Sequence, residues 1–224
     1  MRNIAVILAR GGSKRIPRKN IRDFEGLPLL IHSVASALES KLFETIIVST
    51  DDDEIEVVVQ KHGIKTLRRS GRNSSDEATT SDALLEVLKF WETVKFDNVC
   101  CLYPNPLINP LKIIEAYELM NERNFDSVFP VVKYGHPIQR SLQVNDSRVN
   151  QFYPINLRTP TQDLESTYHD AGQFYWCKID RFRKSESILS DNTGSIELLE
   201  TECQDLDNEI DWKMAELKYK LLNQ

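Results

Sequence analysis

The chain has 224 residues and a formal net charge of −6; 41% of its residues are hydrophobic and 28% are charged. This length and balance predict one globular domain with a substantial core, and they exclude wholesale disorder. The negative net charge argues against nonspecific nucleic-acid binding, and no apolar stretch reaches the roughly 18 residues of a membrane span. We therefore expect a soluble, cytoplasmic protein whose partners include no nucleic acid and no membrane.

The four cysteines are consistent with that compartment. Cys100 and Cys101 are adjacent within the apolar run VCCLY, which is typical of small core residues, and Cys177 and Cys203 stand alone. The sequence contains no CxxC spacing, so we expect no structural zinc site.

Residues 4–20, IAVILARGGSKRIPRKN, combine two kinds of chemistry. Residues 4–9 form a nearly unbroken apolar run, which predicts a strand buried on both faces, as in a parallel sheet. Gly11 and Gly12 then interrupt the run, and no acidic residue appears until Asp23. The basic side chains of this loop are Arg10, Lys14, Arg15, Arg18, Lys19 and Arg22.

The chemistry of this loop suits a polyphosphate. A glycine pair lets backbone N–H groups approach an anion closely, and Lys and Arg bring charge to phosphate oxygens. The first strand-to-loop junction of an open α/β sheet is also a common ligand position. The alternative is a solvated basic turn. Because the loop matches neither the P-loop pattern nor GxGxxG, its pattern needs another explanation.

Apolar runs and helical spacings alternate along the first 132 residues. The predicted strands span residues 4–9, 43–50, 64–67, 98–103 and 126–132. The predicted helices span residues 28–38, 54–62, 81–91 and 111–122. We expect the acidic cluster 51–54 to cap the second helix, with a metal site as the alternative, and Ser81 or Asp82 to cap the third. The alternation predicts the α/β class with a doubly wound, mostly parallel sheet.

The alternation ends after residue 132. Residues 133–161 alternate polar and apolar side chains around Asn145-Asp146-Ser147, which predicts a projecting β-hairpin arm that covers a site or builds an oligomer contact. Residues 172–178 resume an apolar strand, residues 195–199 suggest an edge strand, and residues 209–222 predict a closing amphipathic helix. We expect a single domain over residues 1–224.

Several motifs resemble those of one enzyme family. ARGGSKRIPRKN at 9–20 is similar to the signature of the CMP-sialic acid (acylneuraminate) synthetase family, the cytidylyltransferases that activate nine-carbon keto-sugar acids. VSTDDDEI at 48–55 and QDLD at 204–207 resemble its second and metal-binding motifs. Residues 129–142 and 168–176 are similar to its pseudaminic acid branch. The resemblance implies a Rossmann-like nucleotidyltransferase fold.

The resemblance assigns the first loop to the triphosphate of CTP. The residues that it assigns to nucleotide binding are Arg10, Gly11, Gly12, Ser13, Lys14, Lys19, Asn20, Arg69 and Ser81. Side chains and backbone N–H groups of the loop would hold the phosphates, Arg69 would read the cytosine, and Ser81 would contact the base. The implied catalytic residues are Arg10, Lys19 and Asp207, with Lys19 neutralising the α-phosphate during attack.

The resemblance assigns Mg²⁺ to Asp205 and Asp207. Mg²⁺ prefers one or two carboxylates together with substrate phosphates and water, and on an extended segment this spacing places both carboxylates on one face. The alternative is that the two aspartates only precede and cap the last helix.

A sugar acid requires a cation for its carboxylate. The residues that we assign to sugar binding are Tyr103, Lys133, Gln139, Arg140, Arg158 and Gln173. The family's dimers suggest a homodimer in which the arm serves the neighbouring subunit. The sequence departs from the family pattern at 104–107, where Pro-Asn-Pro-Leu stands, and at Arg72 and Asn73, which leaves the base and ribose contacts less defined than the phosphate contacts.

The implied reaction transfers CMP from CTP to the anomeric hydroxyl of a nonulosonic acid and releases pyrophosphate. The resemblance to the pseudaminic acid branch implies that this sugar is pseudaminic acid. The alternatives are the same reaction on legionaminic, sialic or deoxyoctulosonic acid, a glycosyltransferase, or a catalytically inactive nucleotide-binding module. A triphosphate substrate explains the cations of the first loop better than a nucleotide diphosphate does.

Overall fold

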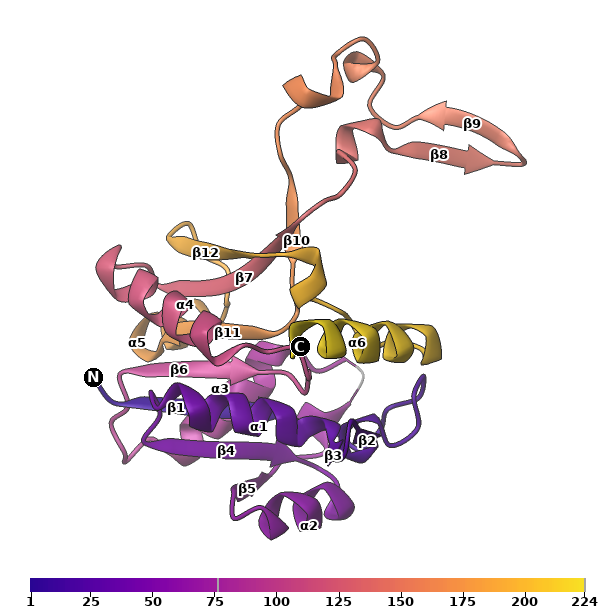
Figure 1. Cartoon of the computed structure of the whole chain (residues 1–224). Coiled ribbons are helices and arrows are strands. Elements are labelled where there is room, and N and C mark those ends of the chain that lie inside the picture. The colour runs from indigo at the N-terminus through magenta and orange to yellow at the C-terminus, as the bar shows by residue number, and fades with distance from the viewer. Residues whose placement is uncertain (76, 224) are drawn as a thin grey trace.

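The computed structural model describes residues 1–75 and 77–223, and its centre is an eight-stranded sheet (Figure 1). Its strands are β1 Asn3–Leu8, β4 Thr45–Thr50, β5 Lys65–Arg68, β6 Asn98–Leu102, β7 Ser127–Lys133, β10 Tyr168–Asp170, β11 Phe174–Lys178 and β12 Thr193–Leu198. The strand order is β10-β7-β11-β6-β1-β4-β5, and β12 pairs with β7 off this path. The predicted strands are all present, whereas β10 was not predicted.

The sheet is mostly parallel in its first half. Strand β1 pairs in parallel with β4 and with β6, and β4 pairs in parallel with β5. Strand β11 enters antiparallel between β6 and β7, and β10 also runs antiparallel to β7. The predicted α/β class with a mostly parallel sheet is therefore confirmed.

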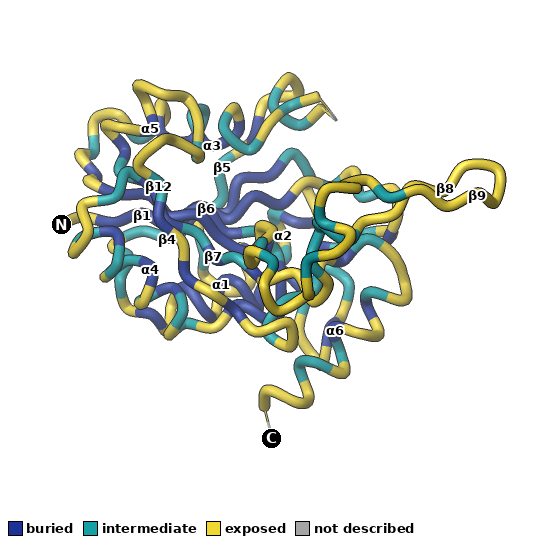
Figure 2. Tube along the Cα trace, turned by 90° about the horizontal axis from the view of Figure 1, so that it is seen from above, coloured by how far each residue is buried: buried dark blue, intermediate teal, exposed yellow. Residues whose placement is uncertain are grey.

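Helices cover both faces of the sheet, and β1 is therefore buried on both sides. The helices are α1 Leu29–Ser40, α2 Asp53–Lys61, α3 Thr80–Phe90, α4 Pro110–Glu122, α5 Ile179–Ser185 and α6 Glu209–Leu222. Ala5 and Ile7 pack into the core beneath α1 and α4, while Val6 packs into the core beneath α3 and α5. Figure 2 shows the buried strands as a dark central band between more exposed helices.

Shorter elements complete the chain. Two short strands, β2 Asp23–Phe24 and β3 Leu27–Pro28, pair with each other. The 3-10 turns are Lys19–Ile21, Arg72–Ser74, Ile138–Arg140, Pro154–Asn156, Thr161–Asp163 and Glu200–Glu202. Within the described residues, no helix is long and apolar enough to cross a membrane.

Two helix caps test the sequence reading. The Asp52 side chain accepts from the Ile55 N–H at 3.0 Å, which confirms that the acidic cluster caps α2. The cap of α3 was predicted wrongly, because Thr79 is extended and its hydroxyl accepts from the Asp82 N–H at 3.1 Å. The Asp82 carboxylate accepts from the Thr79 N–H and completes a capping box. Ser81 therefore lies inside the first turn of the helix.

The predicted arm is a hairpin that projects from the body (Figure 1). Strands β8 Leu142–Asn145 and β9 Arg148–Gln151 pair antiparallel. The two residues between them, Asp146 and Ser147, both have positive φ, which matches the twist of a two-residue hairpin. The chain leaves the sheet at the end of β7 and returns through β10, so two adjacent antiparallel strands connect the arm to the sheet.

Candidate active site

A cavity of about 690 Å³ opens where β1 and β6 end. Its walls come from the loop after β1, the segment from β5 to the start of α3, the segment after β6, and the residues just before α6. Ligands of open α/β sheets occupy this position because parallel strands direct their carboxyl ends and following loops to one edge.

The fold brings together most of the predicted nucleotide and metal residues. The predicted residues that line the cavity are Arg10, Ser13, Lys14, Lys19, Asn20, Arg69, Tyr103, Asp205 and Asp207. The first loop and the late aspartates thus share one wall although about 190 residues separate them. Gly11, Gly12 and Ser81 do not line the cavity. The lining residues that sequence reasoning assigned no role include Arg15, Asn73, Ser75, Thr79, Thr80 and Asn105.

The acidic cluster after β4 anchors the first loop. The Gly11 N–H donates to Asp51 Oδ1 at 3.0 Å, and a Cβ on Gly11 would lie 2.2 Å from Asp52 Oδ2. Arg18 clamps Asp52 through two hydrogen bonds of 2.7 and 2.9 Å. In this structure Asp51 accepts the Gly11 N–H that the resemblance assigned to phosphate; that assignment stays a prediction. Gly11 is needed because Asp52 approaches the backbone so closely.

Lys19 lies between the loop and the aspartates. It opens the 3-10 turn Lys19–Ile21, and its Nζ donates to the Leu206 carbonyl at 3.0 Å. Burial lowers the pKa of Lys19, while the negative charges of Asp205 and Asp207 oppose that shift. The Asn20 side chain donates to the Arg10 carbonyl at 2.8 Å and so closes the loop on itself.

The two aspartates do not cap the last helix. Asn208 caps α6, because its side chain accepts from the N–H groups of Ile210 and Asp211. The Asp207 carboxylate instead accepts from Arg15 Nη1 at 2.7 Å. This leaves Asp205 and Asp207 on the extended segment that lines the cavity.

Asn105 holds this segment against the sheet. Its side chain donates to the Gln204 carbonyl at 3.0 Å and accepts from the Leu107 N–H at 2.9 Å. Asn105, which belongs to the stretch 104–107 where the sequence departs from the family pattern, therefore holds the segment that carries Asp205 and Asp207. Sequence reasoning marked the departure but not its structural role.

Arg69, Thr80 and Tyr103 also line the cavity. Arg69 is buried and donates from Nε to Ser49 Oγ at 3.1 Å and from Nη2 to the Ser49 carbonyl at 2.6 Å. The hydroxyls of Thr80 and Tyr103 share a hydrogen bond, and burial raises the pKa of Tyr103 to about 12. At the start of α3, the hydroxyl that lines the cavity is that of Thr80 and not that of Ser81, to which the resemblance assigned the base contact.

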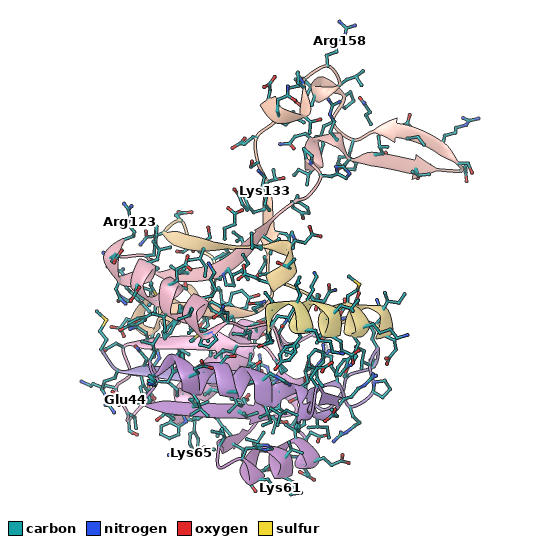
Figure 3. All side chains as sticks on the ribbon, viewed as in Figure 1. Glu44, Lys61, Lys65, Arg123, Lys133 and Arg158 are labelled. Atoms are coloured by element: carbon teal, nitrogen blue, oxygen red, sulfur yellow. The ribbon has the colours of Figure 1, made fainter. Side chains whose placement is uncertain are left out.

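The predicted sugar residues other than Tyr103 do not line the cavity of their own chain. Arg140 donates to the carbonyls of Leu157 and Thr159 within the arm, so it braces the arm. Figure 3 shows Lys133 at the base of the arm and Arg158 at its far end.

Two glutamines of the sugar set are engaged elsewhere. Gln139 donates to the Glu165 carbonyl at 3.0 Å. Gln173 is buried and donates to the Glu202 carbonyl at 2.6 Å. Both side chains therefore support backbone carbonyls of their own chain, and their assignment to sugar binding stays a prediction.

The donor set of the cavity fits a metal that takes few protein ligands. Within residues 1–75 and 77–223, no group of three or more His, Cys, Asp or Glu side chains could hold a metal. Asp205 and Asp207 offer two carboxylates beside the cationic loop, and Mg²⁺ is commonly held by one or two carboxylates plus substrate phosphates.

Comparison with known proteins decides the family. A family model described as cytidylyltransferase matches residues 4–197. The chain belongs to the cytidylyltransferase family. Its relatives include the pseudaminic acid cytidylyltransferase of Campylobacter jejuni subsp. jejuni serotype O:23/36 (strain 81-176), which is 36% identical over 99% of this chain and 97% of that protein. The N-acylneuraminate cytidylyltransferase of Oncorhynchus mykiss is 34% identical over 95% of this chain and 49% of that protein.

A solved structure supports the fold of this cytidylyltransferase. A CMP:2-keto-3-deoxy-manno-octonic acid synthetase complexed with CTP superposes with a TM-score of 0.74 at 18% identity, covering 100% of this chain and 99% of that chain. The predicted family, its likeness to the pseudaminic acid branch and the nucleotidyltransferase class of the enzyme are confirmed.

Proposed function

We propose that this cytidylyltransferase transfers CMP from CTP to the anomeric hydroxyl of a nonulosonic acid, with pseudaminic acid as the substrate. The observation that carries the proposal is the shared cavity wall of Lys19, Asp205 and Asp207 beside the cationic loop. The full-length likeness to a pseudaminic acid cytidylyltransferase supports this choice of sugar.

The reaction is a displacement at the α-phosphorus of CTP. The anomeric oxygen of the sugar forms a bond to that phosphorus, the bond to the β-phosphate oxygen breaks, and pyrophosphate leaves while the hydroxyl loses its proton. Arg10, Ser13 and Lys14 hold the triphosphate, and Lys19 neutralises charge on the α-phosphate as the displacement proceeds. The buried position of Lys19 strengthens this interaction because water screens it less.

Asp205 and Asp207 hold Mg²⁺ in this proposal. A bound Mg²⁺ neutralises negative charge on the phosphates and orients them. Asn105 keeps both carboxylates at the cavity by fixing the segment that precedes them. Arg69 reads the cytosine, and the Thr80 and Tyr103 hydroxyls lie at the same end of the cavity.

A second copy of the chain completes the sugar site. Apolar side chains of the arm remain largely exposed in one chain, with Leu142 at 58%, Val144 at 63%, Phe152 at 59% and Ile155 at 90%. Such an apolar surface favours association. In a homodimer, the arm cations Lys133 and Arg158 meet the sugar carboxylate in the neighbouring cavity.

The test measures pyrophosphate release with CTP and Mg²⁺ against pseudaminic, legionaminic, sialic and deoxyoctulosonic acids in parallel. We expect strong release with pseudaminic acid alone. Pyrophosphate release with another acid would support the proposed reaction but overturn the assignment of the sugar. No pyrophosphate release with any of the four acids would overturn the proposed reaction. Sedimentation of the active enzyme tests the dimer, which an active monomer would refute.

A further inference from the structure

Arg15 lies in the candidate active site without a role in the proposed reaction. Its Nη1 donates to Asp207 Oδ2 at 2.7 Å, across 192 positions of the chain. The Arg15 side chain is 71% exposed and that of Asp207 is 35% exposed. Both residues line the cavity. An arginine of the phosphate-facing loop therefore holds a carboxylate that the proposed reaction assigns to Mg²⁺.

The two neighbouring arginines of the loop have structural contacts outside the cavity. Arg18 binds Asp52 and also Glu54, the latter at 2.6 Å. Arg22 binds Glu209, and its guanidinium carbon lies over the Trp212 ring, 4.3 Å from the ring centroid. Arg15 differs from both, since its carboxylate partner belongs to the cavity itself.

The contact between Arg15 and Asp207 competes with a divalent cation. A guanidinium on Asp207 Oδ2 occupies a ligand position, and its positive charge repels a metal at the same carboxylate. A metal that took Asp207 Oδ2 as its ligand would have to take the place of Arg15 there. The displaced side chain is long and largely exposed, and its forked donors match phosphate oxygens in the same cavity.

We propose that Arg15 is the counter-ion of Asp207 in the metal-free enzyme and moves to the triphosphate of CTP when the metal binds. The inference rests on the proposed function, because it uses the metal and the nucleotide of that reaction. The exchange couples the two ligands: the metal releases a phosphate-binding cation, and CTP keeps that cation away from the metal carboxylate.

The experiment measures binding without the sugar, so that no turnover occurs. The free Mn²⁺ signal in electron paramagnetic resonance reports metal affinity of the full chain, and calorimetry reports CTP affinity with Mn²⁺ present. For Arg15→Ala we expect Mn²⁺ to bind about threefold to fivefold more tightly without CTP, as removal of an exposed competing ion pair implies. We expect CTP to bind about tenfold more weakly because one charge-assisted contact to phosphate is lost.

Two controls separate the exchange from a general change of charge. Arg22→Ala removes a cation of the same loop whose partner is Glu209, and we expect its Mn²⁺ affinity to equal that of the unmodified enzyme. In an Asp207→Asn background, Arg15→Ala should no longer tighten Mn²⁺ binding, since the ion pair to be removed is already absent. Thermal melting confirms that each variant is folded.

Each alternative result overturns the inference in a recognisable way. Equal Mn²⁺ affinity for Arg15→Ala and the unmodified enzyme would refute the competition. Equal tightening by Arg22→Ala would refute its specificity, and unchanged CTP affinity would refute the transfer of Arg15 to phosphate. An unmodified enzyme that binds neither Mn²⁺ nor CTP would overturn the proposed function and the exchange with it.

Discussion

Substituting Gly11 by alanine tests how the acidic cluster anchors the first loop. The new Cβ would lie 2.2 Å from Asp52 Oδ2 and 2.7 Å from Asp52 Cβ and Cγ, so the carboxylate or the loop must move. Gly12 provides a matched control, because a Cβ there meets no atom within 4 Å. Both substitutions stiffen the unfolded chain alike, and the comparison cancels that effect.

The magnitude follows from what Asp52 holds in place. Its carboxylate caps α2 through the Ile55 N–H, and loss of such a cap costs about 1 kcal/mol. Its pair with Arg18 is partly exposed and contributes at most about 1 kcal/mol. We therefore expect Gly11→Ala to lower the free energy of unfolding by about 1–2 kcal/mol relative to Gly12→Ala. For a domain of this size, that corresponds to a melting temperature lower by about 2–8 °C.

Calorimetry and urea unfolding of both variants measure this difference. CTP titration should show a greater loss of affinity for Gly11→Ala, because movement of the loop displaces Arg10 and Ser13 from the cavity. Melting temperatures within about 1 °C of each other would refute the reasoning, since they would mean that the approach of Asp52 to the Gly11 backbone does not constrain the loop.

Three further predictions concern single side chains. Arg18 holds the pKa of Asp52 at about 2, so the ionised Asp52 carboxylate stabilises the folded state at pH values above its unfolded pKa near 4, and this stabilisation disappears as pH falls toward 2. The difference in urea midpoint between the unmodified protein and Asp52→Asn should stay constant from pH 7 to 5 and narrow below about pH 4. Lys19→Met should reduce kcat by about 10²–10³ with the fold intact. Because burial lowers the pKa of Lys19, the steady-state rate of the unmodified enzyme should fall as pH rises, and this fall should begin at a lower pH than the titration of an ordinary lysine would give. Asn105→Ala should lower the free energy of unfolding by about 1–2 kcal/mol and weaken Mn²⁺ binding in a titration, because the Gln204 carbonyl loses its donor.

Much of the fold could be read from local patterns. The apolar run 4–9 requires burial on both faces, and the alternation of such runs with helical spacings requires helices above and below the sheet. The hairpin turn at Asp146 and Ser147 was likewise readable, because Asn145-Asp146-Ser147 is a cluster of turn-forming residues and aspartate tolerates the positive φ found at Asp146. The cap of α3 was misread, since Thr79, Ser81 and Asp82 are all capable of capping and the backbone at Thr79 decides among them.

The candidate site divides in the same way. The sequence by itself determined that the first loop is rich in glycines and cations and that Asp205 and Asp207 are spaced two residues apart, and the family resemblance assigned these residues to phosphate and Mg²⁺. Only the tertiary structure decided which groups line the cavity and which contact one another: the Gly11 N–H donates to Asp51, Thr80 and not Ser81 lines the cavity, and Arg15 donates to Asp207.

The physical reason is the range of the interactions. A helix, a strand or a turn depends on residues within a few positions of one another, and their signals persist in the sequence. The contacts that orient the site join residues from about 40 to about 190 positions apart, and they exist only after the sheet has brought the carboxyl ends of its strands to one edge. The pairing of each donor with its acceptor is therefore a property of the folded chain.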